Sequence, residues 1–265
     1  MNKIAICILA SLALVTFSCD KKKDAETTPD SEKKLVLGEQ PIFKVSNTSE
    51  AITIDGKMDE EIWSKTESRT FDYIYKVEKP TDKQKTTFRM LWDKENLYLF
   101  YDFEDKYLTA RETKRDGKPF LDDCGEIFII PVPDSLNTHF GIELNINKAA
   151  NDFIYFNNYY QEKQLALKTF NPDYETAVNY NGTVNNNTDI DKGWQLEIKI
   201  PLATFGFLGE IVPVQKGNKW AFLAIRQDRN EVEGERRITS TLFPIYDISK
   251  DVHQPNRFGL MEFVY

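Results

Sequence analysis

The sequence contains few residues of the kinds that bind transition metals or form disulfides. It has three cysteines and two histidines among 265 residues. Two of the cysteines, Cys7 and Cys19, lie in the first nineteen residues, so Cys124 alone remains for the rest of the chain and cannot form an internal disulfide. His139 and His253 are far apart in the sequence, and no motif pairs either with a methionine or a cysteine. This scarcity argues against a zinc site and against a haem held by two protein ligands.

Basic residues are also in the minority. Lysine and arginine number 34 against 42 aspartates and glutamates, which gives a net charge of −8. Without a basic stripe the chain has no means of releasing counterions from a phosphate backbone, which argues against a nucleic-acid partner. The sequence also lacks a phosphate loop, a dinucleotide fingerprint, heptads and internal repeats. The excess of acidic over basic residues is ordinary for the surface of a soluble exported protein.

The chain has one long apolar run, at residues 4–17. It is shorter than the ~20 residues that a membrane-spanning helix needs. Because it follows Lys3 and ends in Thr-Phe-Ser-Cys, it predicts a secretory signal peptide over residues 1–18. The junction between Ser18 and Cys19 resembles a bacterial lipobox, which implies that Cys19 becomes a lipidated first residue. The alternative is a plain secretory peptide with an incidental cysteine.

The remaining chain divides into a tether and one domain. Residues 19–40 are rich in Lys, Asp, Glu, Thr and Ser and are expected to form a flexible tether. Residues 41–265 suit one large β domain better than two small ones. The lipobox reading implies an outer-membrane lipoprotein, on either the periplasmic face or the cell surface.

The clearest strand pattern lies between residues 85 and 133. Residues 88–93 and 97–105 alternate aromatic and aliphatic residues on either side of a short turn, which predicts a hairpin. Residues 125–133 form an apolar run of the length of one buried strand. We expect the function at the loop 111–123, at the edge of this sheet.

Similar patterns predict about eleven strands and short helical turns at residues 57–64 and 202–207. The predicted class is therefore all-β, an antiparallel two-sheet β-sandwich. The other expected strands are residues 41–47, 51–56, 140–148, 152–160, 176–184, 194–200, 220–228, 238–243 and 257–265.

Five motifs occur in an order and spacing that resemble one family. They are ITIDGKMDEEIW at residues 52–63, LWDKENLYL at 91–99, DDCGEIFI at 122–129, GWQLEIKIP at 193–201 and HQPNRFG at 253–259. Together they resemble the carbohydrate-binding module family 9-like domain, which is related to DOMON-type sandwiches, and the resemblance covers residues 41–265. It implies a β-sandwich that binds glycan.

The resemblance also implies roles for particular residues. The aromatic that stacks on a sugar ring in sugar-binding members falls on Phe120, and the strand glutamate that holds sugar hydroxyls falls on Glu126. A second aromatic would fall near Val252, where valine cannot stack. Family members often hold structural calcium, so calcium is a further expectation, although no acidic spacing here defines its site.

Sugar sites combine a flat apolar face with charged partners for hydroxyl groups. The candidate ligand-binding residues are Phe120, Asp123, Glu126, Arg226, Asp228, Arg236 and His253. Four of them keep open alternatives. Glu126 is alternatively a solvent-facing charge or a partner of Arg226, Arg226 a member of a structural ion pair, and His253 a turn residue. Arg236 has the alternative of being solvated beside its neighbouring arginine.

Several other conspicuous residues are expected to be structural. Trp63, Trp92, Trp194 and Trp220 lie in family motifs or alternating strands, and core packing is predicted for all four. Cys124 is interpreted as a small core residue rather than a nucleophile.

Catalysis requires two carboxylates ~5–9.5 Å apart across a sugar. Glu126 and Glu143 would approach each other if they share a face, but any acidic β protein offers such pairs. We therefore expect a non-catalytic, lipid-anchored protein that captures glycan or oligosaccharide for glycoside hydrolases or a transporter. The alternatives are a haem-binding or electron-transfer subunit of the DOMON kind, and an accessory or structural lipoprotein that supports a protein partner.

Overall fold

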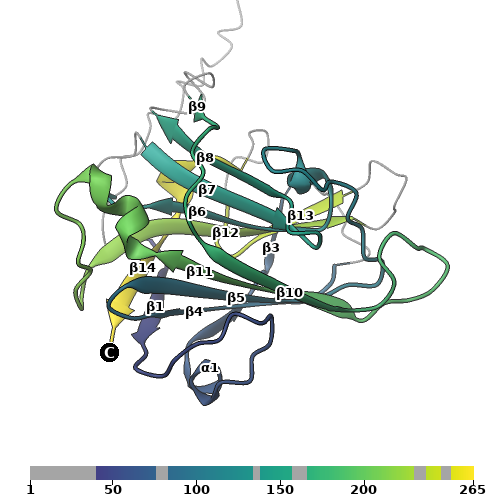
Figure 1. Cartoon of the computed structure of the whole chain (residues 1–265), viewed down its shortest axis with the longest axis horizontal. Helices are drawn as coiled ribbons and strands as arrows, with labels where there is room; N and C mark the ends of the chain where they lie inside the picture. Colours follow the sequence, from purple (N-terminus) through teal and green to yellow (C-terminus); the bar gives the residue numbers. More distant parts are fainter. Residues whose placement is uncertain (1–39, 76–82, 134–137, 157–165, 230–236, 246–251) are drawn as a thin grey trace, which may run out of the picture. The chain divides into compact units, whose positions relative to one another are not determined.

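The computed structural model describes residues 40–75, 83–133, 138–156, 166–229, 237–245 and 252–265 (Figure 1). The predicted signal peptide, the lipidated Cys19, nearly all of the tether and the candidate Arg236 lie outside the described residues. Within those ranges, no helix combines the length and the apolar character needed to cross a membrane.

The described chain is mostly β-structure, as predicted. Its strands are β1 (Ile42–Asn47), β2 (Ser68–Thr70), β3 (Tyr73–Tyr75), β4 (Thr86–Trp92), β5 (Asn96–Glu104), β6 (Cys124–Ile130), β7 (Thr138–Asn145), β8 (Ala150–Phe156), β9 (Ala166–Leu167), β10 (Glu175–Asn181), β11 (Gly193–Pro201), β12 (Lys219–Arg229), β13 (Arg237–Thr241) and β14 (Gly259–Val264). The helical elements are α1 (Glu61–Lys65) and the 3-10 turns η1 (Pro119–Leu121), η2 (Leu202–Leu208) and η3 (Pro255–Arg257).

All the strands join one hydrogen-bonded sheet. Its order is β10-β11-β5-β4-β1-β14-β12-β6-β7-β8-β9, and β13 pairs with β12 and β3 while β2 pairs with β4. The predicted antiparallel arrangement is wrong, because β1 runs parallel to both β14 and β4. Alternation within a strand reports which side is buried and carries no information on the direction of its neighbours. The result is a curled mixed sheet, and the described strands do not divide into the two separate sheets of the predicted sandwich.

The curl packs β6 and β12 onto β5 and β11. A Cβ atom on Gly125 would lie 2.8 Å from Leu196 and 3.0 Å from Phe103, so the two faces are in contact. Phe103 in turn stacks on Trp194 at 4.1 Å between ring centroids. All four tryptophans and Cys124 are buried, which confirms their predicted core positions.

Most predicted strands occur within a few residues of their expected bounds. The hairpin of β4 and β5 is confirmed, and every residue of β6 is buried. Residues 51–56 form no strand, because the amides of Asp55 and Gly56 donate to the carboxylate of Glu197 at 3.0 and 2.9 Å instead of to a neighbouring strand. β2, β3 and β9 have two or three residues each, too few to show alternation.

Candidate functional site

Two adjacent aspartates fix the loop that leads into β6. Asp123 accepts the backbone N–H of Thr109 at 2.5 Å through one oxygen and that of Arg229 at 2.6 Å through the other. Asp122 accepts the backbone N–H groups of Arg111 and Glu112 at 2.9 and 2.8 Å. Both carboxylates therefore anchor backbone, and the structure places the candidate Asp123 in this role.

Phe120 lies on the short turn η1, directly before those aspartates. Its side chain is half-buried. The backbone carbonyl of the next residue, Leu121, accepts a hydrogen bond from the Arg229 guanidinium at 2.6 Å. The turn packs against β6, β7 and β12. It precedes the end of β6 where Cys124 pairs with Asn145, so Phe120 is held at that end of the sheet.

A row of polar side chains crosses five neighbouring strands on one face of the sheet. Thr239 of β13 donates to Gln227 of β12 at 2.6 Å, and the Gln227 amide donates to Glu126 of β6 at 2.8 Å. Glu143 of β7 is directly opposite Glu126, and Asn151 of β8 donates to Glu143 at 2.6 Å. In Figure 1 these strands lie side by side. We call these five residues the polar row.

Glu126 and Glu143, the two carboxylates of the polar row, share a face because they are opposite each other in the pairing of β6 with β7. They are 1% and 4% exposed, and residues opposite each other in an antiparallel pair have Cβ atoms about 5 Å apart. Burial, together with the charges of Glu126 and Glu143, raises the pKa of the Cys124 thiol well above its ordinary value. Carboxylates accept and amides both donate and accept, so the row offers what neutral hydroxyl groups need.

Aromatic rings continue the same face beyond the polar row. Phe128, two residues after Glu126, stacks on His253 at 4.4 Å between centroids, and Tyr155 is 4.9 Å from His253. Gly141 leaves room for Phe153, whose ring would be 2.1 Å from an added Cβ atom. The candidate His253 is therefore a buried ring in an aromatic cluster beside the row.

The only two histidines of the sequence contact each other. His139 Nε2 and His253 Nδ1 are 3.0 Å apart. Two axial histidines lie on opposite sides of a haem, and the direct contact between these rings leaves no space for a macrocycle between them. The geometry does not favour the haem alternative.

Arg226 and Asp228 lie on the opposite face of β12 from the polar row. The Arg226 guanidinium is 3.1 Å from Asp105 and 3.4 Å from Asp228, and it also donates to the Thr86 hydroxyl at 2.9 Å. It lies 5.3 Å from the centre of the Phe103 ring. The structure thus places Arg226 in an interior ion pair and does not bring these two candidates to Glu126.

The carboxylates around Arg226 are the place to test a calcium ion. Oxygens of Asp105, Asp123 and Asp228 lie within 4.8 Å of one another. Calcium takes 6–8 oxygen ligands. Both Asp123 oxygens already accept hydrogen bonds from backbone amides, and the Arg226 guanidinium already neutralises Asp105 and Asp228. Burial raises the pKa of Asp105 to about 6, although Arg226 opposes this shift, and burial also raises the pKa of Asp123. These residues fit an arginine better than a calcium ion.

Sequence reasoning did not include four members of the polar row among its candidates. Gln227, Thr239 and Asn151 are not among the predicted ligand-binding residues, and Glu143 enters only as one of a pair of carboxylates for catalysis. Each is a polar residue on a buried strand, which is the available signal. Which of them share a face depends on strand register, and a single sequence does not specify the register.

The described strands thus form a continuous curled β-sheet that carries a polar row and aromatic rings on one face. The family model "Carbohydrate family 9 binding domain-like" matches residues 54–264, and the chain belongs to this family. No curated protein matches the sequence.

Three solved structures share the fold. A carbohydrate binding module family 9 from Caldicellulosiruptor kristjanssonii in complex with glucose has 19% identity and a TM-score of 0.57, and covers 84% of this chain and 95% of its own. The module of the same name in complex with cellotriose has 20% identity and a TM-score of 0.57, and the match covers 84% of this chain and 94% of the module. A putative carbohydrate-binding protein from Bacteroides uniformis has 14% identity and a TM-score of 0.60, and the match covers 84% of this chain and 99% of that protein.

Proposed function

We propose that this protein binds glycan at the polar row, with Glu126 as its central residue. The observation that carries the proposal is the hydrogen-bonded series from Thr239 through Gln227 to Glu126, facing Glu143 and Asn151, on a domain of a carbohydrate-binding family. The complexes of the Caldicellulosiruptor module with glucose and cellotriose support a neutral sugar as the ligand class.

The chemistry of recognition follows from the groups in the row. The carboxylates of Glu126 and Glu143 accept hydrogen bonds from sugar hydroxyls, and the amides of Gln227 and Asn151 donate to sugar oxygens. A hydrogen bond to a charged group contributes about 1.5–3 kcal/mol. Because both carboxylates are almost fully buried, a sugar must displace their present contacts, and we expect association slower than the usual range of about 10⁵–10⁷ M⁻¹s⁻¹.

We propose binding without hydrolysis. An amide holds each carboxylate, Gln227 for Glu126 and Asn151 for Glu143. The two acids are also cross-strand neighbours on one face rather than groups on opposite sides of a cleft. This placement suits two adjacent acceptors for one sugar.

The N-terminal sequence supports a location for this binding. A signal peptide over residues 1–18 and a lipidated Cys19 would anchor the domain to the outer membrane through the tether, where it would capture oligosaccharide for a hydrolase or a transporter. Cys19→Ala tests the anchor. We expect this variant in the soluble fraction of cells, and its retention in the membrane fraction would contradict lipidation.

Titration calorimetry of the purified protein tests the site. The probes are glucose, cellotriose and oligosaccharides of xylan, mannan and galactan. Glu126→Gln keeps the shape of the side chain but removes its charge, and we expect about ten-fold weaker binding, since one charged hydrogen bond contributes about 1.5–3 kcal/mol. The control is Glu210→Gln, the same change at an exposed position. Absence of binding to every probe, or equal affinities for the two variants, would refute the proposal.

A further inference from the structure

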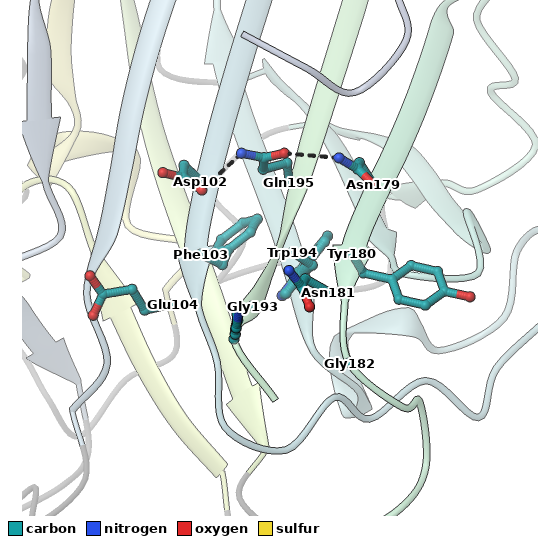
Figure 2. Close-up of a pocket in the computed structure, with 11 residues that line it drawn as sticks. Asp102, Phe103, Glu104, Asn179, Tyr180, Asn181, Gly182, Gly193, Trp194 and Gln195 are labelled. Carbon is teal, nitrogen blue, oxygen red and sulfur yellow. Dashed lines mark hydrogen bonds between the residues drawn. The ribbon is translucent and has the colours of Figure 1, made fainter. Parts of the chain in front are cut away.

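A second polar surface lies on the strands at the other end of the sheet order. β5, β11 and β10 carry an open groove with a volume of about 440 Å³, shown in Figure 2. This volume is within the range of about 300–1,000 Å³ that is typical of ligand sites. None of the residues that line it belongs to the polar row.

Three side chains from three strands form a ladder along the groove. Asn179 is paired in register with Gln195, and Gln195 with Asp102. The Asn179 amide donates to the Gln195 oxygen at 3.3 Å, and the Gln195 amide donates to Asp102 at 3.3 Å, as the dashed lines in Figure 2 show. These bonds fix which way the Gln195 amide points. The second Asp102 oxygen, the Asn179 oxygen and one N–H of each amide stay available for a ligand.

The row next to the ladder has a gap at its centre. Gly193 stands between Glu104 and Asn181 in the pairing of the three strands. Its φ is +139°, and an added Cβ atom would lie 2.0 Å from the Phe103 carbonyl oxygen, so no other residue fits here without a backbone shift. Backbone therefore forms this part of the floor, between two exposed polar side chains.

The groove's composition selects a class of ligand. Its charged residues are Asp102, Glu104 and Lys192, a net charge of −1, which disfavours phosphorylated or sulfated ligands. The side chains of Phe103 and Trp194 are 1% and 2% exposed, so no apolar pocket is available to anchor a peptide side chain. A series of amides and a carboxylate with fixed orientation matches adjacent hydroxyl groups on a neutral sugar.

We propose that this groove is a second glycan-binding site, which takes a stretch of a neutral oligosaccharide along the Asn179–Gln195–Asp102 ladder. It works independently of the polar row, because the two surfaces share no residue. Two sites on one domain would raise the avidity for a polysaccharide that reaches both.

The test uses the Glu126→Gln protein, in which the polar row is weakened. It is titrated with neutral oligosaccharides of cellulose, xylan, mannan, galactan and arabinan. We expect it to retain binding to at least one of them. Adding Asn179→Ala and Gln195→Ala should weaken that residual binding about ten-fold, because two ligand hydrogen bonds are lost.

A matched control separates this effect from damage to the strands. Glu175→Ala with Lys199→Ala removes an ion pair between the same two strands, β10 and β11, outside the groove, and should leave residual binding unchanged. If Glu126→Gln abolishes binding to the whole panel, or if the ladder variant binds as tightly as this control, the second site is refuted. Loss of binding through Glu126→Gln alone would leave the polar-row proposal standing, so the two proposals fail separately.

Discussion

Replacing Arg226 by methionine separates a structural from a ligand-binding role for this residue. The change removes the guanidinium that lies 3.1 Å from Asp105 and 3.4 Å from Asp228 and keeps much of the apolar volume. Three buried carboxylates would then share a space in which their oxygens lie within 4.8 Å of one another. Removing one partner of a buried ion pair costs about 3–5 kcal/mol, a large share of a typical domain stability of about 5–15 kcal/mol.

The loss should depend on pH, because the repulsion needs ionised carboxylates. Burial already raises the pKa of Asp105 to about 6 with the arginine in place, and removing the cation raises that pKa further. Urea unfolding should therefore show a larger loss for Arg226→Met above pH 6 than below it. The triple variant with Asp105→Asn and Asp228→Asn should recover most of the stability. Where the variant is folded, glycan affinity should be unchanged, because Arg226 lies on the face of β12 opposite to Gln227 and Glu126.

Three results would contradict this reasoning. The first is a stability loss below about 1 kcal/mol, the size expected of an exposed ion pair. The second is an equal loss on both sides of pH 6. The third is weaker glycan binding by a variant whose unfolding midpoint has not moved. That result would mean that Arg226 contacts the ligand.

Two further perturbations test the interior. Burial raises the pKa of Asp105 to about 6 in the folded protein, against an ordinary value of 3.8. Between these two pH values the folded chain therefore holds a proton that the unfolded chain has released. The contribution of this group to the stability of the fold is complete below pH 3.8 and is lost as the pH rises through 6. We expect the contribution of this group to the free energy of unfolding to fall by about 3 kcal/mol at most between pH 3.8 and 6. The Asp105→Asn variant should lack this part of the pH dependence. Urea unfolding that gives the same pH dependence for both proteins would contradict the prediction. Gly141→Ala should destabilise the fold by about 1–3 kcal/mol in thermal or urea unfolding, because its Cβ atom would be 2.1 Å from the buried Phe153 ring, and Phe153→Leu in the same chain should restore part of the loss. An unchanged midpoint for Gly141→Ala would mean that the ring has room to move.

The sequence predicted strands well where alternation was long and poorly where direction and register mattered. β4, β5 and β11 each have seven to nine residues, enough for an alternating pattern to be visible, and β6 is visible as a continuous apolar run. The parallel placement of β1 between β14 and β4 depends on contacts between the two ends of the domain, and local pattern carries no trace of them. The same limit affected the candidate site. Glu126 and Arg226 both lie on buried strands, but only the pairing of Arg226 with Gly125 shows that Arg226 and Glu126 are on opposite faces.

The family motifs far apart in the sequence gain a physical meaning once their contacts are known. Glu197 in the GWQLEIKIP motif accepts the amides of Asp55 and Gly56 in the ITIDG motif at 3.0 and 2.9 Å, across more than a hundred residues. Gly56 has a φ of +79°, and its Cβ position lies 3.0 Å from the backbone nitrogen of Asn179, so the turn needs glycine to reach β10. Burial raises the pKa of Glu197 to about 7, although these two amides oppose the shift. This glutamate therefore joins a turn to the sheet, two residues from the Gln195 of the proposed second site. The same strand, β11, therefore carries a buried carboxylate that holds the turn and the half-buried Gln195 amide, to which the second-site proposal assigns a ligand.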